Sequence, residues 1–289
     1  MVHYKQSKEW SQYLATLGWK TKPATGGNLY YRSLPLLGNL GKAPRLILEK
    51  PASQIPQLVD DLKKEKIRLV TLEPEFSNQP KLLHHALQNN GFKPTNHPLT
   101  PPLTLITNLN NDENELKKNL HTLAQRQIKK ARQKNILVST YRWPIPAEQL
   151  NDFYQLACQT ADRQHCFRES FDQLINKANL FKDKCFLVMT SCHDQPAAGV
   201  FLLIHDQIAY YHHAASGLLA HQTGAAYLAA WETINLSKKL GCQKFDFEGI
   251  YDPRYPKYCT GWQGFSEFKK KFGGEELEYP KVWRRLSMF

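Results

Sequence analysis

The sequence predicts an α/β protein built from two domains of similar size. Apolar residues with helical spacing and apolar residues with strand spacing alternate along the whole chain, which is typical of mixed α/β folds. The 289 residues exceed the length of one ordinary domain. Near the middle, Trp143-Pro144-Ile145-Pro146 disfavours continuation of a helix or a strand and predicts a linker or domain boundary.

The first half predicts helices and strands in alternation. The helix at 8–17 has Trp10, Tyr13, Leu14 and Leu17 at helical spacing and stops at Gly18. The same criteria predict helices at 53–65 and 81–90, and strands at 28–35, 68–74 and 104–109.

A long helix is expected over 112–134, because Asp112 and Glu115 have the spacing of a capping box. Its second half, 126–134, is strongly basic. Such a face is either a solvated helix surface with cations near the C-terminal dipole or a contact for a polyanion.

The second half continues the alternation. It predicts helices at 148–163, 171–180 and 225–240, and strands at 185–190, 199–204, 207–213 and 244–247. The strands at 199–204 and 207–213 form a hairpin around His205-Asp206.

Composition limits the class of protein. Apolar residues make up 42% and charged residues 22% of the chain, which indicates a globular protein. The net charge of +12 attracts polyanions without choosing among RNA, nucleotides and anionic lipids. The six cysteines show no Cys-x-x-Cys pair, so neither a metal site nor a disulfide framework is expected. No transmembrane segment or signal peptide is predicted, and a cytoplasmic location is expected.

Two segments of the last fifth combine charges in a way that favours a functional site. Asp246 and Glu248 lie two residues apart in an apolar strand and are expected to point the same way. The segment 264–274 contains three consecutive lysines among aromatic residues and ends in two glycines. Its cations have the chemistry to hold an anionic substrate or a developing oxyanion.

The segment His221–Ala226 precedes the helix at 225–240. Its small residues, Gly224 and Ala226, allow backbone amides at a helix N-terminus to approach an anion, as in acyltransferases of the GNAT fold. A simple entry from loop to helix explains the segment equally well.

The order of these features resembles the Fem family of peptidoglycan bridge-forming aminoacyltransferases over residues 60–275. The matching motifs are 68–74, Gly91-Phe92-Lys93-Pro94, the basic 126–134 followed by Ile136-Leu137-Val138, Arg163 with Phe167-Arg168, Trp231-Glu232, 241–250, and Phe268-Lys269 with Phe272-Gly273-Gly274.

The resemblance implies two GNAT-like acyltransferase domains. The first would span 1–143 and be completed by the tail 278–289, and the second would span 144–277. It implies transfer of an amino acid from aminoacyl-tRNA to the stem peptide of a peptidoglycan precursor, with no further cofactor, and a monomer is expected. The helical-hairpin arm of some members has no counterpart here, which favours the compact members that act on UDP-linked muropeptides, with lipid-linked acceptors as the alternative.

The resemblance also implies roles for individual residues. Lys269 matches the Phe-Lys motif and would stabilise the oxyanion, beside Phe268 as a substrate contact. Arg168 matches an arginine that holds the acceptor's phosphates. The basic helix would bind tRNA. The residues expected to bind tRNA are Arg126, Lys129, Lys130 and Arg132.

Four further residues are expected to bind substrate. Tyr211 and His213 alternate onto one strand face and would line the acceptor groove, unless Tyr211 is a core aromatic and His213 is solvated. Asp246 and Glu248 would bind or deprotonate the attacking amine, unless they pair with nearby lysines. For Lys269, the alternative is a surface lysine.

The sequence departs from the family at Asn108, where members often have Asp, and this argues against an acid/base role there. Two other functions stay open. The first is an acyl-CoA-dependent GNAT transferase, against which His221 argues, because the acetyl-CoA pattern usually has Gln or Arg there. The second is a non-catalytic RNA-binding module that uses the basic helix.

Overall fold

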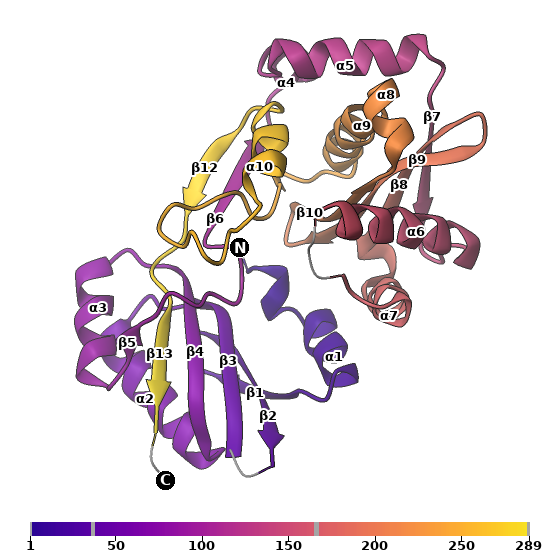
Figure 1. The fold of residues 1–289 in the computed structure, drawn as a ribbon. Coiled ribbons are helices and arrows are strands. Elements are labelled where there is room, and N and C mark those ends of the chain that lie inside the picture. The colour runs from indigo at the N-terminus through magenta and orange to yellow at the C-terminus, as the bar shows by residue number, and fades with distance from the viewer. Residues whose placement is uncertain (1, 36–37, 165–167, 288–289) are drawn as a thin grey trace. The chain divides into compact units, whose positions relative to one another are not determined.

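The computed structural model describes residues 2–35, 38–164 and 168–287, and these form two compact units (Figure 1). Unit 1 comprises 1–103, 251–260 and 278–289, and unit 2 comprises 104–250 and 261–277. Each unit is built around one mixed β-sheet, so the predicted α/β class is confirmed.

Unit 1 contains a six-stranded sheet in the order β1-β2-β3-β4-β13-β5. The strands are β1 (Lys20–Ala24), β2 (Gly27–Leu34), β3 (Gly38–Ile47), β4 (Ile67–Phe76), β5 (Lys93–Pro94) and β13 (Trp283–Leu286). The helices are η1 (Tyr4–Gln6), α1 (Lys8–Thr16), α2 (Pro51–Lys64) and α3 (Pro80–Asn89). Helix α1 begins at Ser7, whose side chain accepts a hydrogen bond from the Trp10 N–H. Apolar faces of α2 and α3 pack against Trp283 and the strands to form the core.

Unit 2 contains a seven-stranded sheet in the order β12-β6-β11-β10-β9-β8-β7. The strands are β6 (Leu103–Asn108), β7 (Leu137–Arg142), β8 (Cys185–Cys192), β9 (Gln195–His205), β10 (Ile208–Ser216), β11 (Lys244–Asp246) and β12 (Glu275–Glu278). The helices are α4 (Glu113–Lys118), α5 (Thr122–Gln133), α6 (Ala147–Gln164), α7 (Phe171–Phe181), α8 (Leu218–Thr223), α9 (Ala225–Lys239) and α10 (Gln263–Lys270), and a short η2 (Lys182–Lys184) follows α7. Figure 1 shows the sheet between α9 on one face and α6 with α7 on the other.

Both sheets follow the same plan. An antiparallel meander ends in a strand, a helix follows, and the next strand pairs in parallel with the end of the meander: β3-α2-β4 in unit 1 and β10-α9-β11 in unit 2. An antiparallel strand from a distant part of the chain then joins each sheet. β13, from the C-terminal tail, pairs with β4, and β6 pairs with β11.

This pairing moves the domain boundary expected at 143/144 to 103/104. β6 is hydrogen-bonded to β11 and β7 to β8, so residues 104–143 belong to unit 2. The segment around Trp143-Pro144 connects β7 to α6 within unit 2. The tail 278–289 lies in unit 1, as the resemblance implied.

The prediction of one long helix over 112–134 is wrong, because the chain forms two helices there, α4 and α5. Asp112 begins α4 as predicted, and its side chain accepts from the Glu115 N–H at 2.8 Å. His121 then begins a second helix, since its Nδ1 accepts from the Leu123 N–H at 3.1 Å. The backbone N–H of His121 donates a hydrogen bond to the Lys271 carbonyl oxygen at 2.9 Å, and this contact fixes the break between α4 and α5.

Candidate functional site

Strands β10 and β11 lie parallel for three residue pairs and then separate. Their pairing runs from Ile208/Lys244 to Tyr210/Asp246, whereas β10 continues to Ser216. The corresponding pair in unit 1, β3 and β4, stays paired to the end of β3, with shifts in register. Ligands of open α/β sheets bind preferentially in crevices outside the carboxyl ends of the strands. The candidate site is therefore placed where β10 and β11 part.

Lys269, the predicted catalytic residue, lies at this place. It projects from α10, and its Nζ donates hydrogen bonds to the carbonyl oxygens of Gly249 at 2.7 Å and Glu248 at 3.3 Å. The ammonium also lies 4.8 Å from the centre of the Phe265 ring. Burial lowers the pKa of Lys269 to about 8, although the carboxylates of Glu248 and Asp246 act in the opposite direction. Lys269 is thus a partly buried cation, held by the backbone of the segment that follows β11.

Asp246 and Glu248 do not share a strand face, so that expectation is wrong. β11 ends at Asp246, and Glu248 has a left-handed φ of 50°. Asp246 is 3% exposed and accepts hydrogen bonds from the Thr104 hydroxyl and from the Glu248 N–H. The turn that puts Glu248 out of line with the strand also directs its carbonyl oxygen to Lys269.

Behind Glu248 lies a group of charged and imidazole side chains, here called the Lys177 cluster: Glu169, Lys177, His212, His213 and Glu248. Lys177 is 3% exposed, and its Nζ lies 2.6 Å from Glu169 Oε2, 2.8 Å from His212 Nε2 and 3.2 Å from His213 Nε2. His212 Nδ1 lies 3.4 Å from Glu248 Oε2. Burial lowers the pKa of His212 to about 3, so this imidazole is neutral.

Tyr211 and His213 lie in different environments, contrary to the expectation that both line one groove. Tyr211 is 6% exposed, and its ring packs 6.0 Å from Phe245 and 5.4 Å from Phe247, so it is a core aromatic. The pairing of β10 with β9 is irregular between Tyr210 and His213. A bulge breaks the two-residue alternation of a strand, and so His212 and His213 both reach Lys177.

Phe268 belongs to an aromatic wall beside Lys269. Its ring packs 4.8 Å from Tyr227 of α9 and 5.2 Å from Phe272. Phe272 in turn contacts Phe247 at 5.6 Å. These rings attach α10 to α9 and to the end of β11, and thereby set the position of Lys269.

The predicted phosphate-binding residue Arg168 lies on the surface, with Nη1 3.7 Å from Asp162 Oδ1. Its predicted neighbour Phe167 lies outside the described residues. Arg168 directly precedes Glu169 in the chain, so its exposed guanidinium lies next in sequence to the Lys177 cluster.

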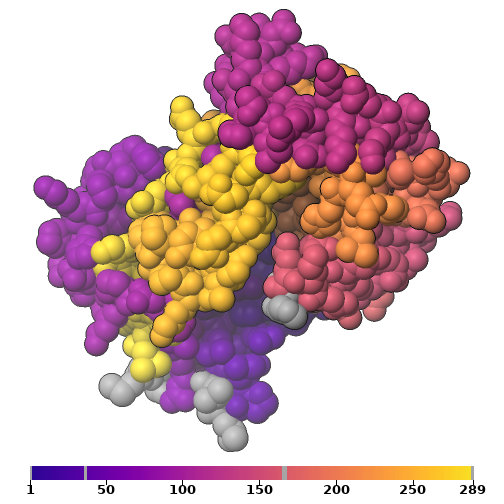
Figure 2. All heavy atoms as spheres, turned by 45° about the horizontal axis from the view of Figure 1, so that its top comes forward, coloured from indigo at the N-terminus to yellow at the C-terminus, as the bar shows by residue number. Residues whose placement is uncertain are grey.

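The basic helix α5 packs on α9 through Ala124, Ile128 and Ala131, and its other face is open to solvent (Figure 2). The predicted tRNA-binding residues differ in what they contact. Arg126 and Lys129 are exposed, and Lys130 is half-buried. Arg132 pairs with Glu232 of α9 at 2.9 Å.

Helix α9 begins at Gly224, whose φ of 81° suits glycine. A Cβ at this position would meet the Gln127 carbonyl oxygen of α5 at 2.5 Å. Gly224 is therefore required by the close packing of α5, which favours a structural explanation for the segment His221–Ala226.

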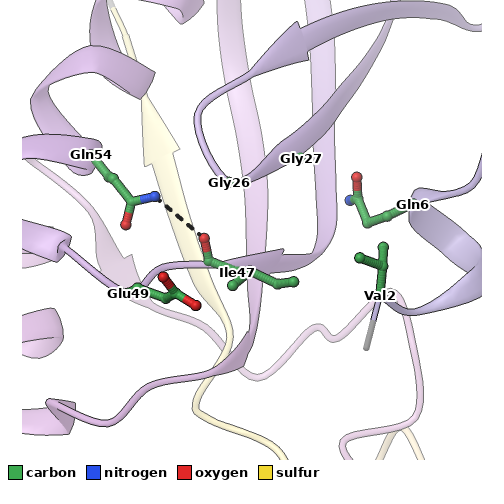
Figure 3. Close-up of a pocket in the computed structure, with 7 residues that line it drawn as sticks. All are labelled: Val2, Gln6, Gly26, Gly27, Ile47, Glu49 and Gln54. Carbon is green, nitrogen blue, oxygen red and sulfur yellow. Dashed lines mark hydrogen bonds between the residues drawn. The ribbon is translucent and has the colours of Figure 1, made fainter. Parts of the chain in front are cut away.

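A pocket of about 390 Å³ lies in unit 1 and contains none of the predicted residues. Figure 3 shows its lining, in which Gln54 Nε2 donates to the Ile47 carbonyl at 3.5 Å. The lining residues are Val2, Gln6, Gly26, Gly27, Ile47, Glu49 and Gln54. Its charged member is Glu49, which disfavours an anionic phosphate.

Sequence reasoning missed Glu169, Lys177 and His212. A pattern was available for Lys177, because α7 buries Leu174, Lys177, Ala178 and Phe181, the spacing of an apolar helix face. A lysine in such a face needs buried partners. Within 2–35, 38–164 and 168–287, no group of three or more His, Cys, Asp or Glu side chains is arranged to hold a metal ion.

Comparisons with known proteins agree with this architecture. Residues 122–261 match the family model described as an acetyltransferase (GNAT) domain. No curated protein sequence gives a significant match. Among solved structures, a crystal structure of FemX is similar with a TM-score of 0.82 and 14% identity, over 99% of this chain and 92% of that chain.

Two other similar structures are described as lysylphosphatidylglycerol synthetases or as part of one. One is the C-terminal domain of a protein from Agrobacterium fabrum that is proposed to be such a synthetase, with a TM-score of 0.67 and 10% identity over 98% of this chain and 89% of that chain. The other is L-PGS from Bacillus licheniformis, with a TM-score of 0.64 and 10% identity over 96% and 88%. The described part of this chain contains no helix long and apolar enough to cross a membrane.

These matches confirm the predicted pair of GNAT-like domains and, in fold, the predicted resemblance to the Fem family. The chain therefore has the two-domain fold of FemX, and the residues that match the GNAT domain model lie mostly in its second unit.

Proposed function

We propose that this chain is an aminoacyltransferase that moves an amino acid from aminoacyl-tRNA to the stem peptide of a peptidoglycan precursor. The observation that carries the proposal is the position of Lys269, a partly buried ammonium held by two backbone carbonyls where β10 and β11 part. The GNAT domain match and the fold shared with FemX support acyl transfer as the chemistry.

The reaction needs little from the protein beyond binding and charge stabilisation. The ester that links the amino acid to tRNA is already activated, and an amine of the stem peptide attacks its carbonyl carbon. The carbonyl oxygen then gains negative charge, which a fixed cation stabilises. An ammonium has three N–H donors. Two of them are directed at Glu248 and Gly249, and the third is assigned to this oxyanion.

The two substrates are both polyanions, which agrees with the net charge of +12. We assign the exposed cations of α5 to tRNA and Arg168 to the diphosphate of a UDP-linked acceptor. A guanidinium suits this role because it forms two parallel hydrogen bonds to phosphate oxygens. A lipid-linked muropeptide carries the same diphosphate and is the alternative acceptor.

The proposal is tested by incubating the purified chain with mixed aminoacyl-tRNAs and either UDP-linked or lipid-linked muropentapeptide. Mass spectrometry should detect a peptide longer by one amino acid. Absence of product with both acceptors and every charged tRNA would overturn the proposal.

A second candidate, N-acyl transfer from an acyl-CoA, is favoured by the description of the matching domain as an acetyltransferase. Titration with coenzyme A separates the two functions. The proposal expects no thermal stabilisation by coenzyme A, whereas a CoA-dependent enzyme would be stabilised in proportion to its affinity. If tRNA binds but no transfer occurs to any acceptor, the chain is instead an RNA-binding module.

A further inference from the structure

Lys177 fixes the orientation of the hydrogen bonds in the Lys177 cluster. An ammonium has three N–H donors and no acceptor. Three acceptors lie within reach of this one: Glu169 Oε2 at 2.6 Å, His212 Nε2 at 2.8 Å and His213 Nε2 at 3.2 Å. Both imidazoles therefore accept at Nε2. A neutral imidazole that accepts at Nε2 carries its proton on Nδ1.

The Nδ1 proton of His212 is directed at Glu248. His212 Nδ1 lies 3.4 Å from Glu248 Oε2, and a carboxylate only accepts hydrogen bonds. The charged or titratable groups that face His212 are Lys177, His213 and Glu248. Burial lowers the pKa of His212 to about 3, although Glu248 acts in the opposite direction, so the imidazole is neutral at ordinary pH. His212 thus links an ammonium on α7 to a carboxylate in the segment that follows β11.

A bulge in β10 makes this link possible. The pairing of β10 with β9 shifts register between Tyr210 and His213, and this breaks the two-residue alternation of the strand. His212 consequently lies between Lys177 and Glu248, and the side chains of all three are at most 15% exposed. Hydrogen bonds in such a poorly solvated group are stronger than in water.

Glu248 connects this group to Lys269. Its left-handed φ of 50° is disfavoured for a residue with a Cβ, so surrounding contacts must hold it. Its N–H donates to Asp246 Oδ1 at 2.7 Å, and its carboxylate faces the His212 N–H. In this conformation its carbonyl oxygen, together with that of Gly249, accepts from Lys269 Nζ. The direction of the ammonium therefore depends on the contacts that hold Glu248.

We infer that His212 is a positioning residue, which acts on Lys269 through Glu248. The consequence for catalysis rests on the proposed aminoacyl transfer. His212 supplies neither charge nor a proton to the reaction. It holds the turn whose two carbonyl oxygens fix the Lys269 ammonium, so that the third N–H of this ammonium stays directed at the developing oxyanion.

Two substitutions of His212 separate its two hydrogen bonds. In H212Q the side-chain amide takes the place of Nε2, so it can accept from Lys177 but does not donate to Glu248. In H212N the amide takes the place of Nδ1, so it can donate to Glu248 but does not accept from Lys177. Each variant loses one hydrogen bond of the Lys177 cluster, and similar decreases in the free energy of unfolding are expected.

Kinetics of the purified full chain distinguish the two variants. H212Q should lower kcat by roughly 10- to 100-fold with little change in KM, because a small displacement of a catalytic group is costly in the transition state. H212N should recover most of this loss. H193N alters an exposed histidine in the β8–β9 turn and should keep the wild-type rate. Equal losses in H212Q and H212N, or an H212Q enzyme with more than half of the wild-type kcat, would overturn the inference.

NMR keeps this inference separate from the proposed function. Nitrogen-15 spectra of histidine-labelled wild-type protein should show His212, assigned by the signal that H212Q lacks, as the Nδ1–H tautomer, and the Nε2–H tautomer would contradict the inference. Exchange of the Glu248 backbone amide hydrogen should be faster in H212Q and close to wild type in H212N, and an unchanged rate in H212Q would also contradict it. If the wild-type chain transfers no amino acid, the proposed function fails, and these two measurements still decide whether His212 holds Glu248.

Discussion

Glu248 is the residue on which the geometry of the site depends most. Its N–H donates to Asp246, its carbonyl accepts from Lys269, and its carboxylate faces His212. It does this with a left-handed φ of 50°, which costs a non-glycine residue about 1–2 kcal/mol. Strained residues of this kind concentrate at functional sites, because the surroundings hold them in place.

Substitution of Glu248 should separate stability from activity. E248G relieves the left-handed strain but loses the side-chain contact with His212, so the free energy of unfolding should change by less than about 1 kcal/mol. E248A loses the same contact and keeps the strain, so it should be less stable than E248G by about 1 kcal/mol. Urea denaturation measures both values. We expect both variants to lose activity, and an E248G enzyme as active as wild type would show that the carboxylate is dispensable.

Lys269 should give the reaction a descending limb at alkaline pH. Its pKa is lowered to about 8, so the ammonium is present below pH 8 and is lost as the pH rises through that value. K269M should lower kcat by at least about 100-fold, the usual effect of removing one oxyanion donor, and should fold normally. K269R keeps the cation at all accessible pH values, so its residual activity should not show the alkaline limb. Neighbouring Lys270 pairs with Glu276 at 2.8 Å, and K270M is the matched control.

At the scale of elements, the sequence predicted most helices and strands of both units because their apolar faces have a regular period. The prediction failed where a contact with a distant part of the chain decides the local structure. The break between α4 and α5 depends on the hydrogen bond from the His121 N–H to the carbonyl oxygen of Lys271, a residue far along the chain. The wrong alternation at His213 follows from a bulge that no local pattern marks. Lys269 was found through a motif, whereas the Lys177 cluster comes together only in the fold.

The exposed face of α5 should give tRNA binding a measurable salt dependence. K129A removes an exposed cation and should lower the slope of log K against log salt by roughly 0.7–0.9, the release of about one counterion. R132A should have a smaller effect, because Arg132 is already paired with Glu232. Filter binding at several salt concentrations measures both slopes. If wild type and K129A gave the same slope of log K against log salt, Lys129 of α5 would not contact tRNA.

At the scale of the whole molecule, the chain passes between the two units more than once, because each sheet takes a strand from a distant segment. Arg254 stabilises the unit 1 ends of these crossings. Its guanidinium binds the Pro102 carbonyl at 3.0 Å, Asp252 Oδ2 at 2.7 Å and Glu278 Oε1 at 2.6 Å. The sequence predicted two domains from alternation and length but placed their boundary at a proline-rich segment. Strand pairing between distant segments leaves no local mark, so that boundary required the structure.

The tail strand β13 should be essential to unit 1, because it lies between β4 and β5 rather than at an edge. Trp283 is 3% exposed and belongs to the core formed with α2 and α3. W283A should therefore lower the free energy of unfolding by about 3–5 kcal/mol, the usual cost of removing a buried aromatic side chain. L286A changes a residue of the same strand that is 72% exposed and should cost less than about 0.5 kcal/mol. Chemical denaturation gives both values, and hydrogen exchange should show the loss of protection in W283A spreading through β4. A W283A protein as stable as L286A would mean that the tail contributes little to the first domain.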